Sequence, residues 1–132
     1  MSLEVLIMTP DKVFLKEKAE EIILPTNTGQ MGVLKNHAPL VTALEVGVIL
    51  LRSNTSWSNV AVMGGFGIVK DNVVTVLVNG AESAETIDKA QAEKNFLEAQ
   101  KRLAQPSLSG KEKIEANFAF KRARARFQAA RS

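Results

Sequence analysis

Ionic side chains are most concentrated near the end of the chain, where residues 121–126 read Lys-Arg-Ala-Arg-Ala-Arg. On a helix, residues three or four apart share a side, so Lys121 and Arg124 fall on one strip and Arg122 and Arg126 on another. Cationic groups at this spacing suit carboxylates or phosphates. Three interpretations stay open: a solvated face of a packed helix, a contact for an acidic protein surface, or a nucleic-acid contact. The segment lacks the interleaved aromatic residues that stack on bases, which weighs against the third.

The charge distribution makes the end of the chain distinct from the rest. Residues 1–86 carry six Lys or Arg against nine Asp or Glu, whereas residues 87–132 carry eleven against five. The formal net charge of +3 therefore comes from the end of the chain alone. Such asymmetry predicts that the tail meets an acidic partner.

His37 is the only histidine in the sequence. A histidine base needs a nucleophile and an orienting acid nearby, and nothing in the sequence places them there. The segment 36–39 favours a structural role for this residue in a loop. A small hydrolase built around His37 is the alternative, and it would require activity from the isolated chain.

Two glycine clusters could bind a ligand or a partner. Residues 64–67 (GGFG) match neither a dinucleotide-binding nor a P-loop pattern and lie between strand-like runs, so we expect a bend or close backbone approach. Residues 29–32 (GQMG) predict a tight turn at one end of a sheet, or an exposed contact loop with Met31 as its adaptable apolar tip.

The remaining residues do not favour catalysis. The only adjacent acidic pair, Glu20 and Glu21, should point to opposite faces of a strand. No group of His, Asp and Glu has metal-ligand spacing, and the chain has no cysteine for thiolate chemistry. We therefore expect a non-catalytic protein without metal or cofactor.

Short apolar runs separated by turn residues dominate the first 85 residues. They cover 3–8, 21–25, 40–44, 46–51, 57–63, 67–70 and 73–78, and Asp71-Asn72 reads as a tight hairpin turn between the last two. No helical period runs between them, so a parallel βαβ sheet is not expected. The spacing predicts a β-sandwich or barrel over residues 1–85.

The pattern changes to a helical one over residues 86–132. Apolar residues recur at steps of three and four at 92, 96, 99 and 103, and again at 116, 120, 123, 127 and 130. Asp88 with Gln91, and Ser109 with Glu112, have capping-box spacing, and Pro106 should end the first helix. The short connector between the helices predicts an antiparallel helical hairpin.

The beginning of the chain runs directly into a strand-like segment. Residues 1–10 have no charged and apolar leader pattern, and no stretch is long enough to cross a bilayer. We expect a chain that is made where it acts or is already processed.

Several of these motifs, taken together, resemble the ε subunit of F-type ATP synthases, most closely its chloroplast and cyanobacterial branch. The matching segments are 21–26 (EIILPT), 29–39 (GQMGVLKNHAP) and 63–66 (MGGF) in the strand-rich part, and 114–117 (IEAN) and 121–124 (KRAR) in the tail. The resemblance covers essentially the whole chain.

This resemblance implies a fold and a place in a complex. The fold would be a ten-stranded β-sandwich followed by a two-helix hairpin. The sandwich would bind the γ subunit in the central rotor stalk and touch the membrane c-ring through Gly29, Gln30, Met31 and Gly32. Some relatives have an acidic residue at the position of Gln30. The protein would take part in proton-driven ATP synthesis, peripheral to the thylakoid membrane on the stromal or cytoplasmic side.

The resemblance also implies that the hairpin can leave the sandwich and inhibit ATP hydrolysis. Lys121, Arg122, Arg124 and Arg126 would contact an acidic segment of a catalytic β subunit in the α/β hexamer. Phe96, Leu103, Phe120 and Phe127 carry most of the apolar area of the hairpin and are expected to hold it compact. A nucleic-acid-binding protein using the basic helix is the alternative function.

One departure from the family concerns nucleotide binding. Some bacterial relatives bind ATP through an Ile-Asp-x-x-Arg-Ala motif, and residues 87–92 keep most of it but have Gln91 in place of the arginine. Loss of a charge that can pair with phosphate predicts no useful ATP affinity.

Overall fold

Alternating burial along the strands shows why the first part of the chain forms a sheet with one face in a core. In the computed structural model, which describes residues 2–131, the side chains of Leu3, Val5 and Ile7 are fully buried. In the strand Val73–Val78, Val74 and Val76 are buried in the same way. This period of two is that of a strand with its apolar side turned inward.

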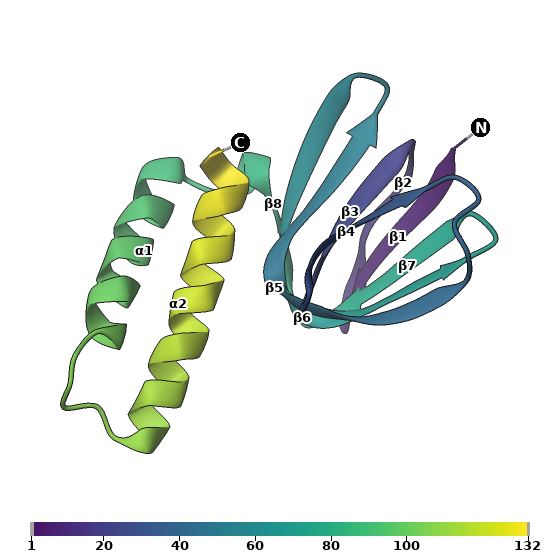
Figure 1. The fold of residues 1–132 in the computed structure, drawn as a ribbon. Coiled ribbons are helices and arrows are strands. Elements are labelled where there is room, and N and C mark those ends of the chain that lie inside the picture. Colours follow the sequence, from purple (N-terminus) through teal and green to yellow (C-terminus); the bar gives the residue numbers. More distant parts are fainter. Residues whose placement is uncertain (1, 132) are drawn as a thin grey trace.

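Eight strands form within residues 2–131, and together they make the sandwich at one side of the molecule (Figure 1). They are β1 Leu3–Thr9, β2 Lys12–Ala19, β3 Glu21–Thr26, β4 Gly29–Leu34, β5 Leu40–Ser53, β6 Ser56–Lys70, β7 Val73–Val78 and β8 Ala81–Ser83. Their order is β2-β1-β7-β6-β5-β3-β4, and β8 pairs with β6. Only β1 and β7 run parallel among the described strands; the other pairs are antiparallel.

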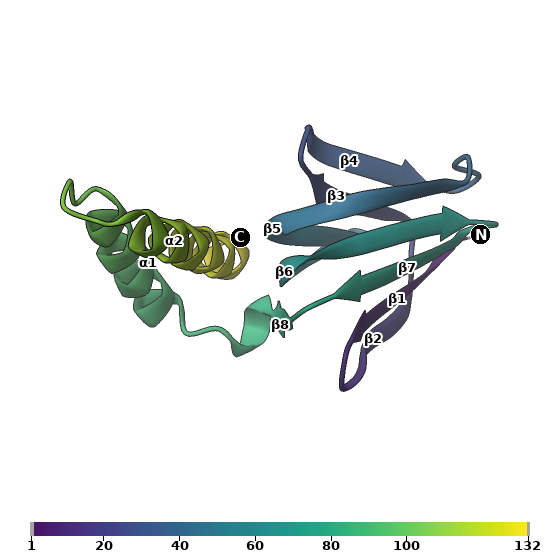
Figure 2. The same cartoon turned by 90° about the horizontal axis from the view of Figure 1, so that it is seen from below.

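The two longest strands connect the two layers of the sandwich (Figure 2). The first half of β5 pairs with the last part of β6, which is flanked by β7. The second half of β5 pairs with the first part of β6. Here β3 flanks β5, and β8 flanks β6. The bend in β6 lies at Gly64 and Gly65, which have positive φ angles of 86° and 157°.

The expected number of ten strands is wrong, because the structure has eight over residues 2–131. The runs 40–44 and 46–51 join into the 14-residue β5, and 57–63 and 67–70 join into the 15-residue β6. The backbone bends at the glycines without breaking the ladder. The sequence runs also omit β2, β4 and β8: β2 is rich in lysine, β4 contains two glycines, and β8 has three residues.

The turn predicted at Asp71 and Asn72 is confirmed. Lys70 pairs with Val73, and the two turn residues have φ angles of 50° and 64°. Two left-handed residues between paired strands match the twist of a two-residue hairpin, and Asp and Asn tolerate this conformation better than most residues.

The tail forms the predicted antiparallel hairpin of α1 Lys89–Leu103 and α2 Gly110–Arg131, preceded by the 3-10 turn Ala84–Thr86. The Asp88 side chain caps α1 by accepting a bond of 3.0 Å from the Gln91 backbone N–H. The Gln91 side chain does not complete a capping box; it donates to Asn95. Before α2, Ser109 and Glu112 exchange both bonds of a capping box, and these bonds hold the pKa of the Glu112 carboxyl below its ordinary value.

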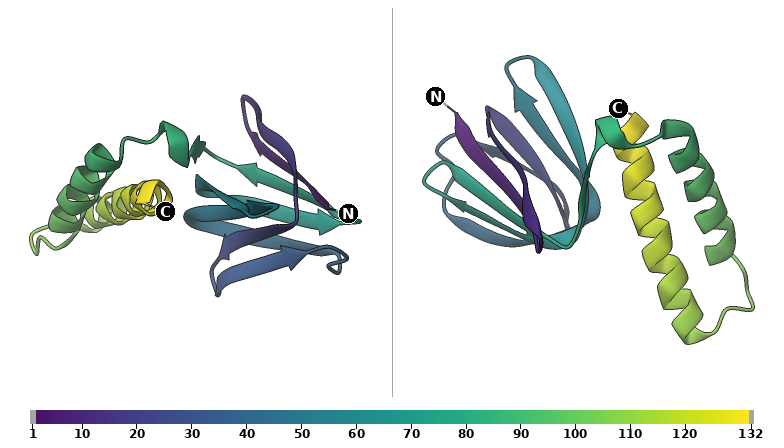
Figure 3. Two further views of the ribbon diagram at one scale, coloured as in Figure 1. Left: turned by 90° about the horizontal axis from the view of Figure 1, so that it is seen from above. Right: turned by 180° about the vertical axis from the view of Figure 1, so that it is seen from behind.

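α2 is buried on two sides, because it lies between α1 and the sandwich (Figures 1 and 3). Phe120 and Phe127 of the predicted stripe face α1. Ala125 and Ala129 form a second buried stripe that belongs to a cluster with Ala61 of β6. The sequence pattern did not reveal this second stripe, since a single small residue such as alanine fits either an exposed or a buried position.

We predict that Gly65→Ala destabilises the sandwich by about 2–3 kcal/mol. A Cβ atom at this position would clash with the Leu77 carbonyl and lie 2.8 Å from Val78 Cα, both backbone atoms of the neighbouring strand. Urea unfolding followed by circular dichroism measures the effect. Gly32→Ala is the matched control, because its Cβ would meet nothing closer than a Glu21 side-chain oxygen at 3.6 Å. Equal midpoints for the two variants would contradict the predicted backbone clash.

Candidate functional site

The segment Gly29–Gly32 lies at the start of the edge strand β4 rather than in a turn, which corrects both conformations predicted for it. A two-residue connection joins β3 to β4, with Thr26 paired to Gly29. The Thr26 hydroxyl donates a bond of 2.6 Å to the Gly29 carbonyl and so fixes this end of the hairpin. Gln30 is exposed, whereas Met31 packs against the core and is no flexible tip.

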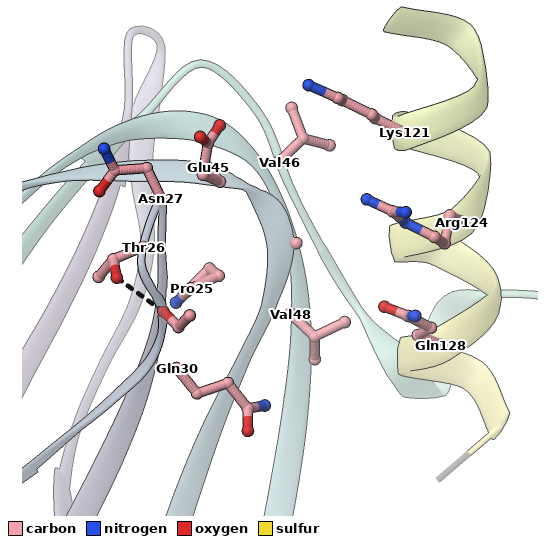
Figure 4. A pocket seen from close by; sticks show the side chains of 12 residues that line it. Pro25, Thr26, Asn27, Gln30, Glu45, Val46, Val48, Lys121, Arg124 and Gln128 are labelled. Atoms are coloured by element: carbon pink, nitrogen blue, oxygen red, sulfur yellow. Dashed lines mark hydrogen bonds between the residues drawn. The ribbon is translucent and has the colours of Figure 1, made fainter. Parts of the chain in front are cut away.

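An open groove of about 360 Å³ separates this end of the sandwich from α2 (Figure 4). The sandwich side is formed by residues 25–27, 29–30 and 45–48. From α2, Lys121, Arg124 and Gln128 point toward it (Figure 4). The structure therefore places Gln30 and two of the four predicted basic contact residues around one groove, although they are far apart in the sequence.

The four basic residues of α2 are divided between different surroundings. Lys121 and Arg124 line the groove, and the Arg124 guanidinium also lies 5.3 Å from the Phe120 ring centroid. Arg122 is exposed on the other side of the helix. Arg126, on that same side, forms an ion pair of 2.6 Å with Glu82 of β8. No single partner surface could contact all four while the hairpin is docked in this way.

Aromatic packing joins the two helices. The Phe96 ring of α1 lies 5.4 Å from the Phe120 ring and 5.5 Å from the Phe127 ring, measured between centroids. Phe127 also packs against the cluster between α2 and the sandwich. Leu103 is half-buried at the end of α1. Phe127 therefore contacts both α1, through Phe96, and the cluster between α2 and the sandwich.

The side chains of His37 and of the acidic pair Glu20–Glu21 make contacts that stabilise the local fold. The His37 Nδ1 atom lies 2.7 Å from the Ala38 carbonyl, a geometry in which the ring nitrogen donates. Glu20 and Glu21 both pair with Arg52, at 2.7 and 3.3 Å, so they converge on one cation although their side chains were expected to point apart.

Over residues 2–131 no three His, Asp or Glu side chains gather where they could hold a metal ion. No described helix is long and apolar enough to cross a membrane.

An apolar face on the outside of the sandwich was missed by the sequence reasoning. Strand register places its residues in two neighbouring rows across β5, β6, β7 and β1. The first row is Val41, Ile68, Thr75 and Leu6; the second is Ala43, Phe66, Leu77 and Met8, continued on β2 by Val13. Val41 is 69% exposed and Phe66 57% exposed. The signal was present in residues 73–78, which are apolar on both sides of the strand, but that pattern also fits a strand buried on both faces.

Comparisons with known proteins agree over the whole chain. The family model described as the beta-sandwich domain of the ATP synthase delta/epsilon chain matches residues 2–84, and the one for its long alpha-helix domain matches residues 85–131. The chain is 62% identical over 128 residues to the chloroplastic ATP synthase epsilon chain of Tupiella akineta, covering 97% of this chain and 98% of that one. It is 54% identical to the ATP synthase epsilon chain of Gloeothece citriformis, with 98% and 95% covered.

A solved structure has the same fold. A chain in the cryo-EM structure of the Euglena gracilis mitochondrial ATP synthase, with OSCP, F1 and c-ring, superposes with a TM-score of 0.84 at 25% identity. The match covers 99% of this chain and 82% of that chain.

We predict that Phe127→Ala lowers the ratio of docked to extended hairpin roughly tenfold, where an extended hairpin is one that has left the sandwich. The truncation removes the contacts of this ring with the cluster between α2 and the sandwich. The chain has no cysteine, so Cys can be introduced at the exposed positions 56 and 101 for spin labels. The distance distribution between the labels gives the ratio. Phe118→Ala is the control, because Phe118 is 52% exposed. An unchanged ratio for Phe127→Ala would mean that this ring does not hold the hairpin.

Proposed function

Because the chain belongs to the ATP synthase delta/epsilon chain family, in its chloroplast and cyanobacterial branch, we propose that its two parts divide the work of a central-stalk subunit. It is an epsilon subunit of the ATP synthase central stalk and is non-catalytic. The part over residues 1–85 anchors the subunit in the rotor, and the part over residues 86–132 regulates it. The subunit acts as a peripheral component of the thylakoid complex, on its stromal or cytoplasmic side.

The exposed apolar face of the sandwich supports the proposed anchoring of residues 1–85 in the rotor. Large exposed apolar side chains gathered on one sheet face mark a protein interface rather than a solvent-facing surface. This face lies on β1, β5, β6 and β7, whereas α2 covers the other half of β5 and β6. The γ subunit binds here, so the sandwich stays anchored whether the hairpin is docked or extended.

The end of the β3–β4 hairpin supplies the proposed contact with the c-ring. Gln30 is exposed there on an edge strand, next to Gly29 and Gly32, which leave the backbone accessible. An uncharged amide both donates and accepts hydrogen bonds. This suits the polar loops of a c-ring without requiring an ionic pair.

The basic residues of α2 supply the proposed inhibitory contact. Lys121, Arg122, Arg124 and Arg126 approach an acidic segment of the catalytic β subunit when the hairpin extends, and so inhibit ATP hydrolysis. Opposite charges steer such an encounter and stabilise the contact. The comparisons give no support to the alternative of a nucleic-acid-binding protein.

We predict that Phe66→Ser weakens binding to γ by about 30-fold or more, because a central aromatic side chain often contributes about 2 kcal/mol or more to an interface. Phe66 is 57% exposed, so the sandwich itself should remain folded. Titration of the γ subunit measures the dissociation constant. Leu97→Ser on α1 is the control, because Leu97 is also exposed but lies on the hairpin. Unchanged γ affinity for Phe66→Ser would assign the γ contact to another surface.

We further expect the triple substitution of Arg122, Arg124 and Arg126 by Ala to relieve inhibition of a catalytic core lacking this subunit. ATP hydrolysis is measured with added wild-type chain, triple variant or a chain ending at Ala84. Substituting Lys89, Lys94 and Lys101 of α1 by Ala gives a control with the same loss of charge. Wild-type chain and control should inhibit, while the triple variant and the short chain should bind γ without inhibiting. Inhibition by the triple variant would contradict the role of the arginines.

A further inference from the structure

Two polar contacts hold the C-terminal part of α2 against the sandwich. The Asn59 side chain of β6 donates from Nδ2 to the Ala129 carbonyl at 3.3 Å. The Arg126 guanidinium, one turn earlier, pairs with Glu82 of β8 at 2.6 Å. Asn59 is 9% exposed and is the one buried polar side chain within residues 2–131.

The bond from Asn59 satisfies a backbone group that the helix cannot satisfy itself. The last four carbonyls of an α-helix have no partner within the helix, and α2 ends at Arg131. The Ala129 carbonyl is one of these four. Asn59 therefore acts as a cap supplied by a residue 70 positions away, and the cap exists only while α2 is docked.

The apolar part of the same interface is built from small side chains. Four of the five buried members of the cluster are alanines, among them Ala61, Ala125 and Ala129, and the fifth is Ile87. The larger side chains Val46, Val48, Met63 and Phe127 pack around it but are only partly buried. Alanine buries little apolar area, so each contact contributes little to docking. Specific polar contacts then account for a larger share of the docking free energy than they would in a leucine-rich interface.

We propose that Asn59 and Glu82 form a clamp that sets the balance between docked and extended hairpin, and that Glu82 keeps Arg126 from its inhibitory contact. Both parts rest on the proposed function, because the extended hairpin and the contact of Arg126 with the catalytic subunit belong to it. Glu82 belongs to the sandwich, so Arg126 loses this ion pair when α2 leaves the sandwich to reach the catalytic subunit. Glu82 and the catalytic subunit therefore compete for Arg126.

The clamp acts through α2 because this helix lies between α1 and the sandwich (Figure 3). α1 is attached to α2 through Phe96 and its two ring contacts. Release of the C-terminal part of α2 therefore frees the hairpin as one unit, without first separating the two helices.

The test uses the full chain with spin labels at positions 56 and 101. Asn59→Asp keeps the shape of the side chain but replaces the donor by a negative charge beside a helix C-terminus, and should raise the ratio of extended to docked hairpin about tenfold. Glu82→Gln should raise it roughly two- to fivefold, the range for a partly exposed ion pair. Asn117→Asp and Glu85→Gln make the same chemical changes at exposed positions and should leave the ratio unchanged.

A charge exchange separates pairing from a general structural effect. The double variant Glu82→Arg with Arg126→Glu should return the ratio to that of the wild type, while each single variant favours the extended form. Ratios that do not move in Asn59→Asp and Glu82→Gln, or that move equally in the controls, would overturn the clamp.

Inhibition of the catalytic core then tests the second part separately. Glu82→Gln should inhibit ATP hydrolysis at a lower concentration than the wild type, because Arg126 is released while its charge is kept. A shifted distance ratio without stronger inhibition would leave the clamp standing and reject the role proposed for Arg126. Stronger inhibition without a shifted ratio would reject the clamp.

Discussion

The long β5–β6 ladder is the constraint on which the rest of the structure depends. Its two strands run through both layers of the sandwich, and the sheet folds over where Gly64 and Gly65 bend β6. One half of the ladder carries the exposed apolar face and the other half carries α2. A change in the bend would therefore alter the core, the apolar face and the hairpin support together.

Under the proposed function, this arrangement separates a permanent contact with γ from the reversible docking of the hairpin. The apolar face presents large side chains such as Phe66 and Val41, which can contribute substantially when a partner covers them. The surface under α2 presents Ala61 and receives Ala125 and Ala129, and each of these alanines buries little apolar area. The proposed switch needs a free-energy gap of only a few kcal/mol between docked and extended hairpin, and the small buried side chains keep the apolar contribution to docking low.

The acidic sandwich neutralises only part of the basic charge of the docked tail. The acidic sandwich provides Glu82 for Arg126, while Lys121 and Arg124 face an open groove beside the β3–β4 hairpin. The basic helix is therefore only partly neutralised by its own chain. Under the proposed function its remaining positive charge meets an acidic partner, and all four cations can do so together only after α2 has left the sandwich.

The sequence by itself determined the local structure and the family. Period-two and helical patterns, the Asp71-Asn72 turn and the Ser109–Glu112 capping box depend on neighbouring residues, and the structure confirms them. The tertiary structure decided the strand count, the second buried stripe of α2, the apolar face and the pairing of Asn59 with Ala129. Each of these depends on residues far apart in the chain: a glycine can bend a strand or end it, and an alanine or an apolar strand position is buried or exposed according to what packs against it. Only the folded register determines which residues meet, because side-chain period and capping carry no information about distant partners.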